Sequence, residues 1–385
     1  MSRVAVRPNL LRWARERSGL TLDDLREKFP KLEEWEAESE SAQPTLRQLE
    51  NFARRTRTPL GYLFLDQPPD ETLPIPQFRT VQTVTQSRPS PDLIETIQMM
   101  QRRQAWLREN LISEHEDRVP FVGTAALTDP PQSVAARIRY ALGLATGWAR
   151  AKGTWEKALR ALREAIDGVG VIVSANGVVG NNNHRKLDVE EFRGFVLVDE
   201  YAPLVFVNAS DSKGAQMFTL AHELAHLWFG ESAVFDLQRL QPAPEQIERV
   251  CNAVAAEFLV PQAELRAEWD AVRSDQERFD KLARIFKVSS IVAARRALDL
   301  ELITQDAFFA FYRDYQAAEH EAHSSDEGGN FYATQNVRLG RRFSVAIVNA
   351  AREGRVTYRE AYELTGLWGQ TFDKYASKLE IGGQE

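Results

Sequence analysis

Two histidines four residues apart, with a glutamate directly after the first, have the spacing in this sequence that points most clearly to chemistry. His222, Glu223 and His226 lie in FTLAHELAHLWFGE (218–231), a segment otherwise rich in helix-forming apolar residues. Four residues advance an α-helix by about 400°, so both imidazoles lie on one face and can bind one ion. Glu223 lies about 100° around the helix, where it can take a proton from a water on the metal. The spacing predicts a zinc hydrolase site; the alternative is a pair of buried core histidines.

A catalytic zinc usually has a third protein ligand and leaves its fourth position to water. The segment PAPEQIERVCNAVAAEFLVP (242–261) contains the candidates, because its prolines are typical of the start and the end of a helix. Glu248 and Glu257 flank its apolar stripe on opposite sides, and helical periodicity alone does not choose between them. Asn252, one turn after Glu248, can hydrogen-bond a metal ligand, which favours Glu248.

FTLAHELAH followed by IERVCNAVAAEFLVP resembles the ImmA/IrrE metallopeptidases, bacterial proteins that join a zinc domain to helix-turn-helix modules. The resemblance covers residues from about 165 to 262. It implies that Glu248, four residues before Asn252, is the third zinc ligand. It also implies a gluzincin-like peptidase whose targets are repressors or other regulatory proteins.

The single cysteine, Cys251, follows Glu248 by three residues on the same expected helix, so its sulfur could face the zinc. One cysteine excludes disulfides within the chain and fits a reducing cytoplasm. Two interpretations stay open. Cys251 is either a small buried apolar residue, or a thiolate that occupies the open position of the zinc and holds the enzyme inactive.

Apolar runs before the zinc helix predict a small sheet, with one strand in 169–177 and two strands in 192–210. An edge strand of such a sheet can pair with an extended peptide, so 194–198 or 204–208 is a candidate substrate cradle. The alternative is an ordinary hairpin that covers the core. His184, in the polar GNNNHRKLD segment, is expected to be an exposed loop residue rather than a ligand.

Composition limits the class of protein. A length of 385 residues predicts two or more domains, and a hydrophobic content of 43% supports a real core. No apolar stretch approaches the roughly 20 residues that span a bilayer, and the start lacks a signal peptide's apolar core, so we expect a cytoplasmic protein without a membrane partner. The net charge of -7 gives no overall attraction to nucleic acid, which would have to bind through local basic patches.

The first 65 residues contain a predicted helix cap at Thr21 and Asp24. They resemble the XRE helix-turn-helix module, down to the pair Trp35 and Glu36 and the P-T-x-x-x-L continuation. A recognition helix uses Arg, Gln or Asn to contact base edges, but at the expected position, 31–42, the sequence has KLEEWEAESESA. Residues 20–41 contain eight acids against three bases, and phosphates repel such a segment. We therefore expect a protein-binding or degenerate module, with operator DNA as the lesser alternative. Eight arginines could still form a basic face elsewhere: Arg7, Arg12, Arg15, Arg17, Arg47, Arg54, Arg55 and Arg57.

The remaining segments are expected to be helical or to link domains. A helix over about 91–113 should pack on the peptidase core or in a partner's groove. Residues 276–302 have a helix-turn-helix outline, six bases and four acids, with scaffolding at least as plausible as DNA contact. The tail, with a predicted capping box at Thr357 and Glu360, is interpreted as a docking domain. The expected order is an XRE-like domain, a Pro-rich linker, the zinc peptidase domain, the helix-turn-helix-like segment packed on it, an acidic linker and a small helical domain: 1–65, 66–91, 92–275, 276–315, 316–330 and 331–385.

The sequence thus predicts a mainly helical, multidomain α+β protein: a gluzincin-like zinc peptidase with a small sheet, flanked by helix-turn-helix-like domains. Zn²⁺ held by His222, His226 and Glu248 would let Glu223 drive cleavage of one regulatory protein, a repressor or antitoxin encoded nearby, in a stress or defence response. The competing hypothesis is a non-catalytic regulator or antitoxin-like protein that binds a partner protein or DNA. Glu223 favours the enzyme, because a purely structural zinc site needs no base beside its metal.

Overall fold

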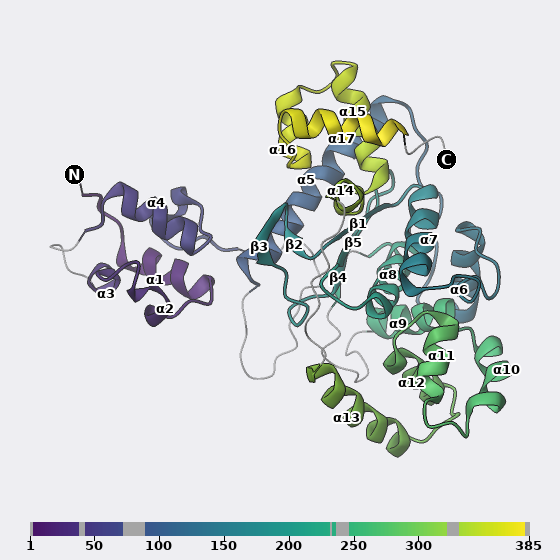
Figure 1. The fold of residues 1–385 in the computed structure, drawn as a ribbon. Coiled ribbons are helices and arrows are strands. Elements are labelled where there is room, and N and C mark those ends of the chain that lie inside the picture. Colours follow the sequence, from purple (N-terminus) through teal and green to yellow (C-terminus); the bar gives the residue numbers. More distant parts are fainter. Residues whose placement is uncertain are drawn as a thin grey trace. The chain divides into compact units, whose positions relative to one another are not determined.

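The computed structural model describes residues 3–37, 43–71, 89–231, 233–235, 246–321 and 331–381 (Figure 1). The chain divides into two compact units, residues 1–97 and 98–385. Helices dominate both, and a small sheet lies in the second unit, as an α+β protein requires. Within the described ranges, no helix combines the length and apolar character needed to cross a membrane. Most of both predicted linkers, at 72–88 and 322–330, lies outside the described residues.

Short helices around an apolar core build the first unit. They are α1 (Pro8–Arg17), α2 (Leu22–Arg26), α3 (Leu32–Glu36), α4 (Leu46–Arg55) and the 3-10 helix η1 (Leu60–Phe64). The predicted capping box of Thr21 and Asp24 is confirmed at the start of α2. A second capping box, of Thr45 and Gln48, begins α4. Local sequence signals therefore set where these helices start.

The tryptophan–glutamate pair of α3 has a structural role. Trp35 is buried in the core of the unit, and the Glu36 carboxylate accepts hydrogen bonds from Arg15 Nε and Nη2 at 2.8 and 3.0 Å. Helix α3, where a recognition helix is expected, is only five residues long, and Glu33 and Glu34 lie in its first turn. An acidic helix repels phosphates, and a helix of this length has few side chains that could contact base edges. The helix-turn-helix assignment itself stays a prediction.

Among the described residues, ion pairs engage four of the eight arginines that could have formed a basic face. The pairs are Arg7–Asp66, Arg15–Glu36, Arg17–Glu71 and Arg57–Asp92. A guanidinium that already faces a carboxylate attracts phosphate less strongly, so the first unit has less capacity for nucleic acid than its arginine count suggests.

The second unit contains a four-stranded mixed sheet with the strand order β1–β5–β4–β6. Its strands are β1 (Ile172–Asn176), β4 (Gly194–Leu197), β5 (Leu204–Asn208) and β6 (Ala233–Phe235). Strands β1 and β5 pair in parallel, whereas β4 pairs antiparallel with both β5 and β6. The strand expected in 169–177 and the two strands expected in 192–210 are confirmed.

Two expectations about strands are wrong. The candidate cradle 204–208 is wrong, because β5 lies between β1 and β4 inside the sheet. The candidate cradle 194–198 has no free edge in this structure, because β6 pairs with the outer side of β4. Pairing with β6, a strand that the sequence pattern did not indicate, places β4 inside the sheet. The polar segment around His184 is not a loop throughout, because β3 (Asn182–Lys186) pairs with β2 (Val178–Val179). His184 is nevertheless exposed, on β3.

Helix α8 (Lys213–Phe229) packs on the sheet against β4 and β5, and α9 (Gln246–Leu259) packs against α8. Ser212 caps the start of α8 by accepting the Ala215 N–H, and Gly230 ends it in the left-handed conformation at φ 75°. Further helices add apolar side chains to the same core: α6 (Pro131–Ala141), α7 (Trp155–Gly168), α10 (Gln262–Val272), α11 (Arg278–Phe286), α12 (Ser290–Asp299) and α13 (Gln305–Glu321).

Helices α11 and α12 form the helix–turn–helix outline expected after the zinc domain. Their apolar residues Phe279, Leu282 and Ala293 belong to the core that also contains α8. Arg296 of α12 is buried and paired with Glu257. These contacts favour the scaffolding interpretation of this segment over DNA contact.

Four helices end the chain: α14 (Phe331–Leu339), α15 (Arg341–Arg352), α16 (Tyr358–Thr365) and α17 (Gln370–Ile381). The predicted capping box of Thr357 and Glu360 is confirmed at the start of α16. Helix α5 (Pro91–Ser113) contributes a buried arginine, Arg103, which donates hydrogen bonds to the carbonyl oxygens of Arg338 and Leu364. Burial lowers the pKa of Arg103 to about 10. Its hydrogen bonds tie α5 to α14 and α16.

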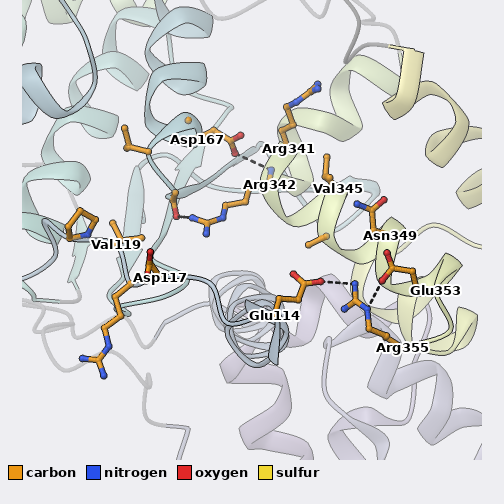
Figure 2. Close-up of a pocket in the computed structure, with 16 residues that line it drawn as sticks. Glu114, Asp117, Val119, Asp167, Arg341, Arg342, Val345, Asn349, Glu353 and Arg355 are labelled. Carbon is orange, nitrogen blue, oxygen red and sulfur yellow. Dashed lines mark hydrogen bonds and ion pairs between the residues drawn. The ribbon is translucent and has the colours of Figure 1, made fainter. Parts of the chain in front are cut away.

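A pocket of about 630 Å³ lies where these last helices meet the core (Figure 2). Figure 2 shows Arg355 between Glu114 and Glu353, with ion-pair distances of 2.8 and 2.6 Å. Asp167 accepts a hydrogen bond from the backbone N–H of Arg342 at 3.1 Å. Because acids and arginines in this pocket offset one another, it presents no strong field of one sign.

Candidate metal centre

The structure brings His222, His226 and Glu248 together, with one ligand atom from each residue within 4.8 Å of the others. Glu248 Oε2 lies 3.2 Å from His222 Nε2, and Glu248 Oε1 lies 3.3 Å from His226 Nε2. The two Nε2 atoms are 3.0 Å apart. In a tetrahedral zinc site with metal–ligand distances of about 2.0 Å, ligand atoms lie roughly 3.3 Å apart. The two Nε2 atoms and the Glu248 carboxylate therefore lie at the separations that such a site requires of its ligands.

Packing of two helices creates this arrangement. His222 and His226 are one turn apart on α8, and α9 packs against α8 so that its first turn presents Glu248. Both histidines are fully buried, while the Glu248 side chain keeps 20% of its surface exposed. Glu248 is therefore the most exposed of the three residues.

Glu257, the other glutamate considered for the third ligand, lies elsewhere. It is buried in an ion pair with Arg296. Its carboxylate also accepts the backbone N–H of Gln262 at 3.3 and 3.4 Å, in the first turn of α10. Glu257 thus links α9 to α10 and α12. It is not part of the group that contains the histidines.

Asn252 sets the orientation of His222. Its Oδ1 lies 3.0 Å from His222 Nδ1, and since an amide oxygen can only accept, Nδ1 carries the proton. The lone pair of the His222 ring is then on Nε2, which faces His226 and Glu248. The expected role of Asn252 beside a ligand agrees with this contact, although the contact is to His222 rather than to Glu248.

Burial shapes the electrostatics of the centre. Desolvation lowers the pKa of His222, which favours the neutral imidazole that binds metals. Burial alone would raise the pKa of Glu248, but hydrogen bonds and charges from His222 and His226 lower it overall, so this carboxylate is ionised. Burial, followed by the charge of Glu248, raises the pKa of Glu223 well above its usual value.

Buried polar atoms without partners test whether a metal and a water fit here. In the described part of the chain, neither Glu223 oxygen has a hydrogen-bond partner, and neither does His226 Nδ1 or Thr219 Oγ1. Buried polar groups normally have hydrogen-bond partners, so unpartnered atoms beside three converging donors indicate a site for a polar ligand. Two imidazoles and one carboxylate are a donor set typical of catalytic zinc. The residues therefore fit a zinc ion with a water next to Glu223.

Cys251 lies apart from the donor group. It is fully buried and belongs to the apolar core, and among the described residues its sulfur is not part of the His222, His226 and Glu248 group. Burial, followed by the charges of Glu248, Glu223 and Glu231, raises the pKa of its thiol well above the usual value. The structure thus favours the interpretation of Cys251 as a small apolar core residue.

Gly194 and Thr219, which were not predicted as site residues from the sequence, lie close to Glu223. A Cβ atom at Gly194 would lie 2.5 Å from Thr219 Cγ2, 2.8 Å from the Phe206 carbonyl oxygen and 3.3 Å from Glu223 Oε1. Only glycine leaves room for this close contact between β4 and α8. The signal was present as an isolated glycine at the start of an apolar strand, a pattern that can mark close backbone approach.

Comparisons with known proteins agree with this geometry. Residues 181–298 match a peptidase family model described as the IrrE N-terminal-like domain. Residues 339–378, in the C-terminal helices, match a domain of unknown function (DUF8813). No curated protein matches the chain. Because the first match includes α8 and α9, which carry the whole donor group, it supports the ImmA/IrrE peptidase family for this part of the chain.

Proposed function

We propose that this protein is a zinc-dependent endopeptidase that cleaves one regulatory protein, such as a repressor or an antitoxin encoded nearby. The observation that carries the proposal is the convergence of His222, His226 and Glu248 at tetrahedral spacing, next to Glu223 with both oxygens unpartnered among the described residues. A purely structural zinc site has no use for a buried carboxylate beside its ligands.

Each residue has a definite part in the proposed reaction. When bound, zinc supplies Lewis-acid polarisation of the scissile carbonyl and makes water more acidic. Asn252 holds the His222 ring so that Nε2 is available as a ligand. Glu223 accepts the proton of the attacking water and later passes it to the leaving amine.

Substitution of Glu223 by glutamine tests the proposal. Glutamine keeps the size of the side chain but cannot accept the proton, so zinc should remain while hydrolysis falls by roughly 10²- to 10⁴-fold. Glu156→Gln, at an exposed position of α7, is the matched control. Each variant is expressed beside its genomic neighbours, and mass spectrometry searches for a shortened partner. If Glu223→Gln supports the cellular phenotype and no neighbour is ever cut, the peptidase proposal is wrong, and the hypothesis of a non-catalytic regulator or antitoxin-like protein takes its place.

For the first unit we propose protein binding in preference to operator DNA. The acidic, five-residue α3 and the ion-paired arginines support this choice. Tight, sequence-selective binding of the full chain to a DNA duplex, lost on removal of residues 1–65, would contradict it.

A further inference from the structure

Strand β6 lies on the side of β4 that faces away from β5, at the edge of the four-stranded sheet. Its register pairs Gly194 with Phe235, Phe195 with Val234, and Val196 with Ala233, in antiparallel orientation. The chain enters β6 four residues after α8 ends at Phe229. The segment directly after the histidine helix thus returns to the sheet beneath that helix.

The direction of the backbone groups of β4 follows from its pairing with β5. Asn208 donates its N–H to the Arg193 carbonyl at 2.8 Å, and the register then alternates along β4. Gly194 and Val196 therefore direct their N–H and C=O groups towards β6. Ala233 and Phe235 are their direct partners, so these two residues bond to β4 while the N–H of Val234 points away from it.

This edge of β4 is next to the proposed catalytic base. A Cβ at Gly194 would lie 3.3 Å from Glu223 Oε1, so the residue of β4 that pairs with Phe235 of β6 lies close to the Glu223 carboxylate. Extended peptides commonly bind proteins by adding a strand to such an edge. In the structure β6 already holds this edge, and His222, Glu223 and His226 are fully buried.

We propose that β6 is an internal blocking strand, which occupies the peptide-binding edge of β4 and which a protein substrate must displace. This inference rests on the proposed peptidase function and adds its regulation. A peptide can bind the edge of β4 only in the fraction of molecules in which β6 is detached, and its apparent affinity is reduced by that fraction. Loosening β6 must therefore raise the affinity for an extended peptide. A small ligand that needs only the metal gains nothing from the displacement of β6.

Two hydroxamate probes separate these effects on the zinc-loaded full chain. Acetohydroxamate binds metal alone, whereas an Ala-Val-Phe hydroxamate also needs a strand edge. Ala233→Pro and Phe235→Pro each remove an N–H that bonds to β4, and both should raise the affinity for the peptide probe at least tenfold. Val234→Pro is the matched control, because its N–H points away from β4, and it should leave that affinity unchanged. Acetohydroxamate should bind all four proteins equally.

Each outcome is informative. If acetohydroxamate does not bind the wild type, the proposed metal site is wrong, and the peptidase function on which this inference rests is contradicted. If acetohydroxamate binds but the proline variants bind the peptide probe no better, or more weakly, β6 does not block the edge. Hydrogen exchange on the wild type gives a second readout that needs no variant. On binding of the peptide probe, the Ala233 and Phe235 amides should lose protection while those of Gly194 and Val196 keep it, and retained protection at β6 would overturn the proposal.

Discussion

Replacing Gly194 by alanine should damage stability and chemistry together, because this glycine lies between the sheet and the catalytic helix. The added Cβ would lie 2.5 Å from Thr219 Cγ2 and 2.8 Å from the Phe206 carbonyl oxygen. Carbon atoms prefer separations of about 3.5–4.0 Å, so α8 or β4 must shift by roughly 1 Å. Overpacking of this kind costs about 1–3 kcal/mol. A shift of that size beside Glu223 can lower the cleavage rate by about 10²-fold.

Urea unfolding and cleavage of the protein substrate measure the two effects of Gly194→Ala. Gly168→Ala is the control, since a Cβ at this helical glycine meets nothing within 4 Å and should stabilise α7 by about 0.5–1 kcal/mol. Adding Thr219→Ser to Gly194→Ala removes the clashing methyl group and should restore part of the loss, although the contact with the Phe206 oxygen remains. Wild-type stability and cleavage in Gly194→Ala alone would refute the reasoning.

Two further predictions concern the neighbours of the metal ligands. Asn252→Ala removes the acceptor that orients His222, so it should weaken zinc binding by roughly 10- to 100-fold. Competition with a chelator measures this affinity, and a wild-type value would contradict the prediction. Cys251→Ala should leave zinc content and basal cleavage unchanged, because the thiol is buried in the apolar core and its sulfur is not among the converging donor atoms of the described residues. A rise in basal cleavage of Cys251→Ala would instead identify the thiolate as a lock on the zinc.

Features set by neighbouring residues could be predicted from the sequence. The helical spacing of His222 and His226, and the capping boxes at Thr21 and Thr357, depend on contacts within one or two turns. The apolar runs of β4 and β5 likewise identified both strands before their partners were known.

Features set by long-range pairing could not be predicted. The short β6 carries no distinct pattern, so its pairing with β4, and with it the loss of a free edge at β4, required the structure. Helical periodicity left Glu248 and Glu257 equivalent, and the fate of Glu257 depends on Arg296, a residue 39 positions away on another helix. His184 was expected in a loop because its neighbours are polar, yet the hairpin of β2 and β3 places it on a strand.

The zinc content of the purified chain tests the central claim most directly. Elemental analysis should find about one zinc per wild-type chain, and about one in His184→Ala, whose histidine is exposed on β3 away from the donor group. His222→Ala removes one of three converging ligands and should lose most of the metal at the same concentration of free zinc. Undiminished zinc in His222→Ala, or a wild type that binds none when zinc is supplied, would contradict the metal centre and the peptidase mechanism proposed on it.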